Sequence, residues 1–133
     1  MAFTSPFPEW RTLLRGLAKE YGLVLPGTDL KIQGVGQIYN SNRKVGFDSG
    51  EVRAQKVALA LEKLGPGTWV MGDHAATDTP EMQAIGHYGY ENVAADRAAV
   101  VTAWTSPRVL EVVKQRGIRL ISYRDLLMEA GNR

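Results

Sequence analysis

The sequence contains no cysteine. This absence excludes a disulfide framework and a zinc site built on thiolates, and it is typical of a reducing compartment. No apolar run approaches the about 18 residues that a membrane-spanning helix needs. The N-terminal stretch MAFTSPFPEW lacks the basic segment and the apolar run of a signal peptide. Together these absences predict a cytoplasmic protein without a membrane span.

Neither sign of charge is in large excess. The 133 residues carry a formal net charge of +2, and 44% of them are hydrophobic. This composition predicts one compact domain over residues 1–133. A mildly basic chain permits a nucleic-acid partner without requiring one. Ten of the 16 lysines and arginines fall in two groups along the chain: Lys31, Arg43, Lys44, Arg53 and Lys56, and then Arg108, Lys114, Arg116, Arg119 and Arg124.

The first half of the sequence predicts two helices separated by a hairpin. Apolar residues recur at three- and four-residue spacing over 8–21, which predicts an amphipathic helix. The segment 31–47 predicts an antiparallel hairpin, because two strand-like stretches flank a polar turn. A second helix is expected over 49–64, with Ser49 as its N-cap.

The second half predicts strands and helices in alternation. The apolar run over 98–104 does not alternate with polar residues, which suits a strand covered on both faces. Such an order of elements predicts a parallel sheet with helical crossovers, and therefore an α/β fold. The expected strands are 68–72, 98–104 and 118–123, and the expected helices are 80–92, 107–116 and 124–131.

Several short stretches in this half carry a family resemblance. They are Glu81-Met82-Gln83-Ala84-Ile85, Ala99-Val100-Val101-Thr102, Thr105-Ser106, Gly117-Ile118-Arg119-Leu120-Ile121 and Arg124-Asp125-Leu126-Leu127. In this order they resemble the C-terminal half of the Mrr-like restriction-endonuclease domain, over less than half of the chain. The resemblance implies a three-layer, restriction-endonuclease-like mixed sheet and a role in DNA binding or DNA processing.

The catalytic pattern of that family is not matched. The family places an acid on one strand and an acid-x-Lys pair on the next, where the carboxylates hold Mg²⁺. The only acid-x-Lys element here is Asp29-Leu30-Lys31, which precedes the expected hairpin. The resemblance therefore implies either a phosphodiesterase with a rearranged metal site or a catalytically degenerate relative.

Asp73, His74 and Asp78 form the most suggestive polar cluster. They directly follow the expected strand 68–72, and ligands of parallel sheets bind beyond the carboxyl ends of the strands. Two carboxylates and an imidazole suit Mg²⁺ or Mn²⁺, or general acid–base catalysis. The alternative is a solvated loop in which Asp78 or Thr79 caps the next helix.

Asp48 and Glu51 lie where the expected hairpin meets the second helix. If the strands adjoin, Asp48 and Asp73 would hold the metal, with Glu51 and His74 as catalytic helpers. The simpler alternative is that Asp48 ends a turn and Glu51 complements the helix dipole. His87 is expected to have a structural role.

Cationic and amide side chains predict contacts with phosphate groups. Asn42, Arg43 and Lys44 occupy the expected tip of the hairpin, where an exposed turn is an equally good interpretation. Arg108 lies in the first turn of a helix, beside backbone N–H groups that suit an anion. With Lys31, these are the predicted nucleic-acid-binding residues.

Three functions remain open. The leading one is a DNA-binding or DNA-processing protein with a nuclease-like fold, using Mg²⁺ where it is active, in a phage or defence setting. The alternative is a non-enzymatic module that binds a protein partner or forms a homo-oligomer, such as a phage structural or host-interaction protein. The third is a small enzyme that binds a nucleotide-like ligand near Gly72 and Thr102.

Overall fold

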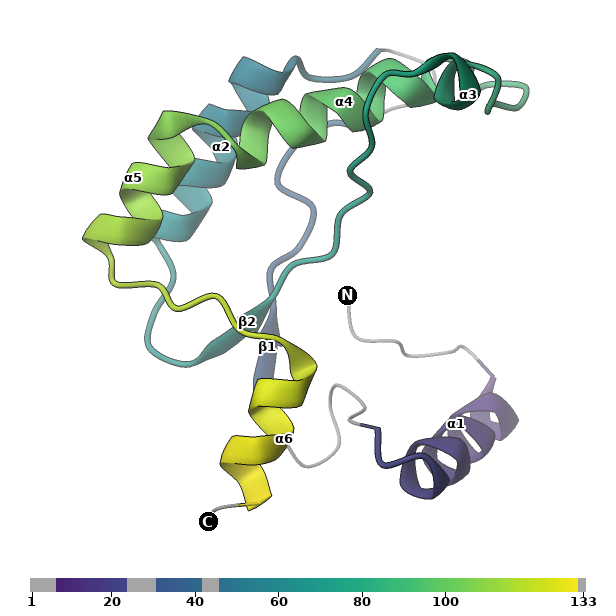
Figure 1. Ribbon diagram of the computed structural model, residues 1–133, viewed down its shortest axis with the longest axis vertical. Helices are drawn as coiled ribbons and strands as arrows, with labels where there is room; N and C mark the ends of the chain where they lie inside the picture. The colour runs from purple at the N-terminus through teal and green to yellow at the C-terminus, as the bar shows by residue number, and fades with distance from the viewer. Residues whose placement is uncertain (1–6, 24–30, 42–45, 132–133) are drawn as a thin grey trace. The chain divides into compact units, whose positions relative to one another are not determined.

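The computed structural model describes residues 7–23, 31–41 and 46–131 (Figure 1). The chain divides into two compact units. One, which we call the helical unit, comprises residues 35–66 and 72–118, and the other comprises the remaining residues. The elements are α1 (Pro8–Glu20), β1 (Ile32–Gly34), α2 (Gly50–Glu62), β2 (Thr68–Val70), α3 (Pro80–Gln83), α4 (Val93–Trp104), α5 (Pro107–Gln115) and α6 (Tyr123–Gly131).

Local capping explains where α2, α3 and α5 begin. The hydroxyl of Ser49 accepts a hydrogen bond from the N–H of Val52 at 3.3 Å and starts α2. Ser106 and Thr79 cap α5 and α3 in the same way, and proline follows each of them. The observed bounds confirm the helices expected over 8–21, 49–64, 107–116 and 124–131 to within a few residues.

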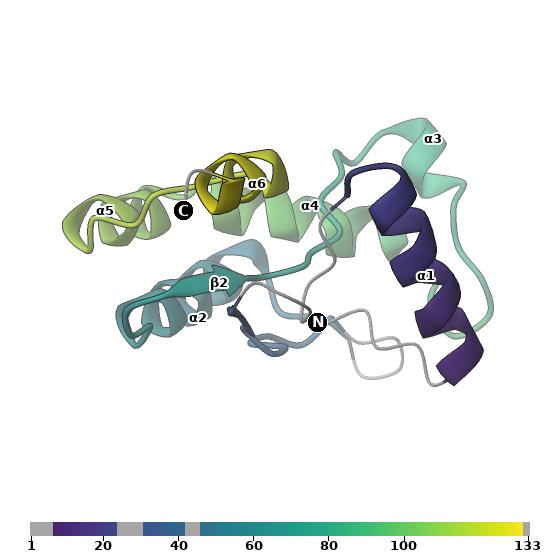
Figure 2. The ribbon, with the colours of Figure 1, turned by 90° about the horizontal axis from the view of Figure 1, so that it is seen from below.

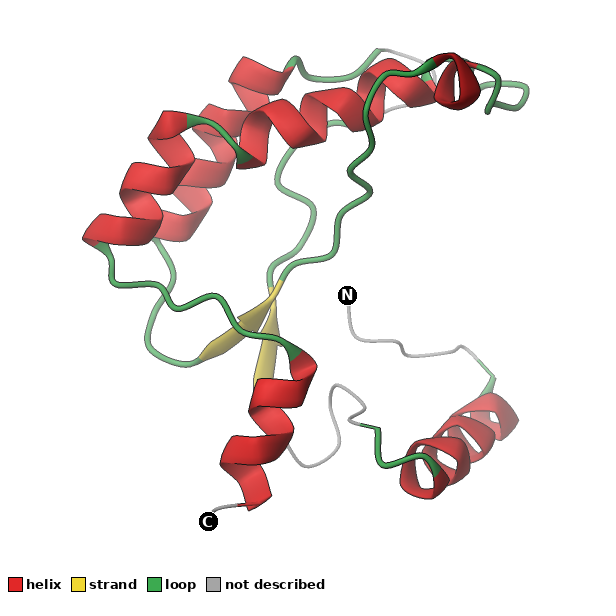
Figure 3. Ribbon diagram, in the orientation of Figure 1, coloured by secondary structure: helices red, strands yellow, loops and turns green. Residues whose placement is uncertain are grey.

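The two strands form a small parallel sheet, drawn in yellow in Figure 3. Ile32 pairs with Thr68 and Gly34 pairs with Val70. β1 does not form the first strand of the hairpin expected over 31–47, because it pairs in parallel with β2. Among the residues of that segment that the structure describes, antiparallel pairing is limited to one isolated bridge between Ser41 and Phe47.

The helical unit is built on α2, which packs against both α4 and α5. Figures 1 and 2 show α4 and α5 following one another alongside α2. Their buried faces supply the apolar core, with small residues on α2 and α4 and valines on α5. One cluster of buried core residues comprises Ala54, Val57, Ala58, Leu61, Ala103, Val109 and Val112.

The strand expected over 98–104 is wrong, because this segment is the second half of α4. An apolar run without alternation fits a buried helix as well as a buried strand. The buried positions of α4 include Val93, Ala99, Val100 and Ala103, which recur at helical spacing. Alanine, which has the highest helix propensity, fills much of the segment.

Two further expectations are corrected. The strand expected over 118–123 is a loop that leads into α6, because no strand pairs with its backbone in the described part of the chain. The helix expected over 80–92 stops at Gln83, and turns follow, with Gly89 in the left-handed region at φ +82°.

Of the three strands expected in the second half, only 68–72 is present, as β2. The described residues form a mixed α/β protein with six helices and a two-stranded parallel sheet. The continuous β-α-β-α-β-α arrangement is not formed. No helix within the described ranges has the length and apolar character needed to cross a membrane.

Candidate functional site

The helical unit contains a cavity of about 350 Å³. This volume lies within the range of small-molecule sites. Its wall combines side chains from α2, from the loop after β2, from the turn that precedes α4, and from α4 itself. The polar residues that line it include Arg53, Asp73, His74, His87, Tyr90 and Arg97.

Arg53 is buried beneath the cavity and has no solvent exposure (0%). Its guanidinium donates hydrogen bonds to the carbonyl oxygens of Asp48 at 2.8 Å, Asp96 at 2.9 Å and Asn40 at 3.3 Å. It also forms an ion pair with the carboxylate of Asp96. Each of the three guanidinium nitrogens therefore has an acceptor within the protein, and Arg53 is not an exposed member of the first group of cations.

Asp96 connects this buried charge to the cavity wall. The residue is 2% exposed, and its carboxylate accepts hydrogen bonds from Arg53 and from the phenol of Tyr90. Burial, and then the hydrogen bond to Asp96, raise the pKa of Tyr90 above its usual value. The phenol therefore stays protonated at neutral pH and keeps donating to Asp96.

Arg97, the next residue, has a different environment. It lines the cavity beside the phenol of Tyr90, where its charge and a side-chain hydrogen bond offset part of the rise in the pKa of Tyr90. Its Nε is buried and has no hydrogen-bond partner among the described residues. Buried N–H groups are nearly always satisfied in native proteins. Arg97 therefore offers a donor and a positive charge for a bound group.

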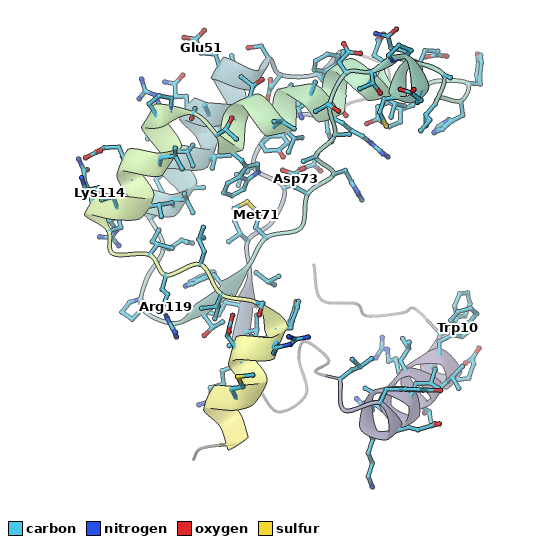
Figure 4. All side chains as sticks on the ribbon, in the orientation of Figure 1. Trp10, Glu51, Met71, Asp73, Lys114 and Arg119 are labelled. Carbon is cyan, nitrogen blue, oxygen red and sulfur yellow. The ribbon has the colours of Figure 1, made fainter. Side chains whose placement is uncertain are left out.

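Asp73 and His74, both predicted as site residues, lie at this cavity. The carboxylate of Asp73 accepts a hydrogen bond from the indole N–H of Trp104 at 3.0 Å and another from the N–H of His74 at 2.8 Å. Figure 4 shows Asp73 on the loop that follows β2. Asp73 and His74 therefore lie at one edge of the cavity, and their catalytic and metal-binding roles stay predictions.

Asp48 and Glu51 are not among the residues that line the cavity. Asp48 accepts hydrogen bonds from the ammonium of Lys56 at 2.6 Å and from the N–H of Asn40 at 2.8 Å. The bond with Lys56 is the main reason why the pKa of Asp48 is lowered. Glu51 points outward from the first turn of α2 (Figure 4).

The described residues contain no cluster of potential metal ligands that would support the metal site predicted for Asp48 and Asp73. Within residues 7–23, 31–41 and 46–131, no group of three or more histidine, aspartate or glutamate side chains is placed to hold a metal ion. Asp78 accepts a hydrogen bond from Gln83 at 2.8 Å, and Thr79 caps α3. These contacts match the capped-loop interpretation of this segment.

The predicted phosphate-contacting residues are distributed over the chain. Lys31 is exposed in the unit that contains β1. Arg108 is exposed in the first turn of α5, where Ser106 already caps the helix. Asn42, Arg43 and Lys44 lie outside the described residues.

Sequence reasoning missed Tyr90, Asp96 and Arg97 as site residues. One signal was available, because Asp96 and Arg97 interrupt an otherwise apolar segment. Charged residues in such a segment are commonly paired when they are buried. The pairing itself joins residues 43 positions apart, so periodicity could not identify Arg53 as the partner.

Comparisons with protein-family models, with curated proteins and with solved structures find no match to this chain. The function is therefore inferred from the residues of the cavity alone.

Proposed function

We propose that the protein binds a phosphate-bearing ligand, a nucleotide or a nucleic-acid strand, in the cavity of the helical unit. The observation that carries this proposal is Arg97, whose buried Nε has no partner within the described part of the chain. A guanidinium recognises phosphate through paired N–H donors. The unfilled donor of Arg97 therefore suits an anionic oxygen.

The charges around the cavity support an anion rather than a cation. The charge of Arg53 is balanced by the buried carboxylate of Asp96. Arg97 forms no ion pair among the described residues. Asp73 is exposed at the edge of the cavity, where Trp104 and the backbone donate to its carboxylate. Arg97 is therefore the cation available to a ligand, and its location beside Tyr90 is partly shielded from water.

Tryptophan fluorescence provides a direct binding test. The chain has three tryptophans, so Trp10→Phe and Trp69→Phe leave Trp104, which contacts Asp73 at the edge of the cavity. Inorganic phosphate, deoxyadenosine monophosphate and short single-stranded DNA are titrated as separate probes. Saturable binding of at least one probe is expected.

Arg97→Gln should weaken that binding by about tenfold or more, because a charge-assisted hydrogen bond is lost. Glutamine retains much of the side-chain length, so the packing of the stem is largely preserved. Lys114→Ala is the matched control, because Lys114 is an exposed cation at the end of α5 in the same unit (Figure 4). Equal affinities for the wild-type and Arg97→Gln proteins would contradict the proposal.

DNA processing with Mg²⁺, and the restriction-endonuclease-like fold that it implies, remain sequence-based predictions. Labelled single-stranded and duplex DNA incubated with and without Mg²⁺ tests the activity. Cleavage that is lost in both Asp73→Ala and Asp48→Ala would support it. The alternative of an interaction or assembly module also stays a prediction, which the oligomeric state in solution tests.

A further inference from the structure

The turn that borders the cavity presents an aromatic ring to solvent. Tyr88 is 99% exposed. It lies in a tight turn closed by two backbone hydrogen bonds between His87 and Tyr90, at 2.8 and 3.3 Å. Gly89, in the left-handed region at φ +82°, completes the turn. His87 and Tyr90, on either side of the exposed segment, both line the cavity.

The turn is held from within the protein. The phenol of Tyr90 donates to buried Asp96, which forms an ion pair with Arg53. The rings of His87 and Tyr90 pack edge to face, with centroids 5.8 Å apart. The ring Nδ1 of His87 lies 3.0 Å from the carbonyl oxygen of Tyr88. These contacts fix the backbone that carries the exposed ring.

We infer that the ligand is a single-stranded nucleic acid. The base of one nucleotide stacks on the ring of Tyr88, and a phosphate of the same strand contacts Arg97. A single exposed aromatic residue is common on protein surfaces. Here the ring belongs to an anchored turn in which His87, one residue before it, and Tyr90, two residues after it, line a cavity with an unfilled guanidinium donor. Stacking platforms next to cationic side chains are the usual means of binding single strands without sequence preference.

The geometry favours a single strand over a duplex. Every base of a single strand offers a π face, whereas the faces of paired bases are stacked inside a duplex. The backbone of the turn is already held in place, so only the side-chain torsions of Tyr88 become ordered when a base stacks on its ring. The loss of conformational entropy on binding is therefore small. Tyr88 therefore supplies the base contact that a phosphate site alone lacks.

The test is a double-mutant cycle between protein and ligand. The protein changes are Tyr88→Ala and Tyr88→Phe, and the ligand change replaces an oligonucleotide with its abasic counterpart. Tyr88→Ala should weaken binding of the intact single strand by about tenfold, which corresponds to the loss of one stacked base. Tyr88→Phe should retain the affinity, because the ring remains.

The abasic strand should bind the wild-type and Tyr88→Ala proteins equally. Tyr21→Ala is the matched control, since Tyr21 is also exposed and lies outside the helical unit. Circular dichroism verifies that each variant is folded. Parallel titrations with deoxyribose and ribose strands of one sequence distinguish DNA from RNA as the source of the ligand.

This inference rests on the proposed function, and the variants separate the two. If Arg97→Gln weakens binding but Tyr88→Ala does not, stacking is refuted and the phosphate site stands. If only Tyr88→Ala weakens binding, the phosphate proposal fails and stacking stands. If neither Arg97→Gln nor Tyr88→Ala weakens binding, both the phosphate site and the stacking of a base are refuted. Duplex DNA that binds as tightly as the single strand, with the same dependence on Tyr88, would overturn the single-strand assignment.

Discussion

The Arg53–Asp96 ion pair is the residue-scale feature on which the cavity depends. Both side chains are buried, and removal of one partner leaves an uncompensated charge in the interior. Asp96→Ala should therefore lower the free energy of unfolding by about 3–5 kcal/mol, measured by urea denaturation. The exposed acid Glu62 is the control, and Glu62→Ala should change stability by less than about 0.5 kcal/mol. A second change, Arg53→Met, should recover part of the loss; failure of Asp96→Ala to destabilise the protein would contradict the pairing.

The ion pair between Asp48 and Lys56 predicts a specific response to acid. The pKa of Asp48 is lower in the folded protein than its ordinary value of 3.8, chiefly because of the hydrogen bond from Lys56. The stabilisation is therefore present above the unfolded-state pKa and is lost as the pH falls through the folded-state pKa. Because the side chains of Asp48 and Lys56 are both partly exposed, this stabilisation amounts to about 0.2–1 kcal/mol.

Urea denaturation of the wild-type and Asp48→Asn proteins checks that prediction when it is repeated from neutral pH down to a pH below the folded-state pKa of Asp48. The wild-type protein should be the more stable one at neutral pH, and the difference should vanish in acid. A difference that stays constant from neutral pH into acid would show that the charge of Asp48 is not the cause.

The crossing of α2 and α4 is the element-scale feature that brings the cavity walls together. A Cβ atom on Gly50 would lie 2.5 Å from the Cβ of Thr102 and 3.2 Å from the carbonyl oxygen of Ala99. Gly50→Ala should therefore force the helices apart and lower the free energy of unfolding by about 1–3 kcal/mol. The cost should shrink in a Thr102→Gly background, which removes the closest contact.

Gly65→Ala is the matched control for thermal denaturation, because nothing lies within 4 Å of a Cβ at that position. A Gly50→Ala protein as stable as the wild type would mean that the helices do not approach this closely.

The elements that the sequence predicted well are those with a local start signal and helical spacing. Ser49 and Ser106 each lie just before a segment with apolar residues at helical spacing, and α2 and α5 begin where these serines indicate. The errors arose where local information is ambiguous. The alanine- and valine-rich segment of α4 has no distinctive period, and only its packing on α2 decides that it is a helix. In the site, Asp73 and His74 were predicted from their position after β2, whereas Arg97 and Tyr90 depend on tertiary contacts.

At the scale of the whole molecule, the structure changes which cations are available to nucleic acid. Arg53 is buried and Lys56 pairs with Asp48, so both leave the basic group that the sequence suggested. Lys31 and Arg108 are exposed, and Arg97 faces the cavity. The net charge of only +2 provides little long-range attraction. Binding of a strand should therefore depend on a few defined phosphate contacts.

The salt dependence of binding measures those contacts. For single strands, the logarithm of the affinity falls with the logarithm of salt concentration by about 0.7 for each phosphate contact. Arg97→Gln should therefore reduce the steepness of this dependence by about 0.7, and combined Arg43→Ala and Lys44→Ala changes by about 1.4 if both residues contact phosphates. Tyr88→Ala should weaken binding at every salt concentration without changing the slope, because stacking releases no counterions. An unchanged slope in Arg97→Gln would show that its guanidinium does not neutralise a phosphate, whatever the loss of affinity.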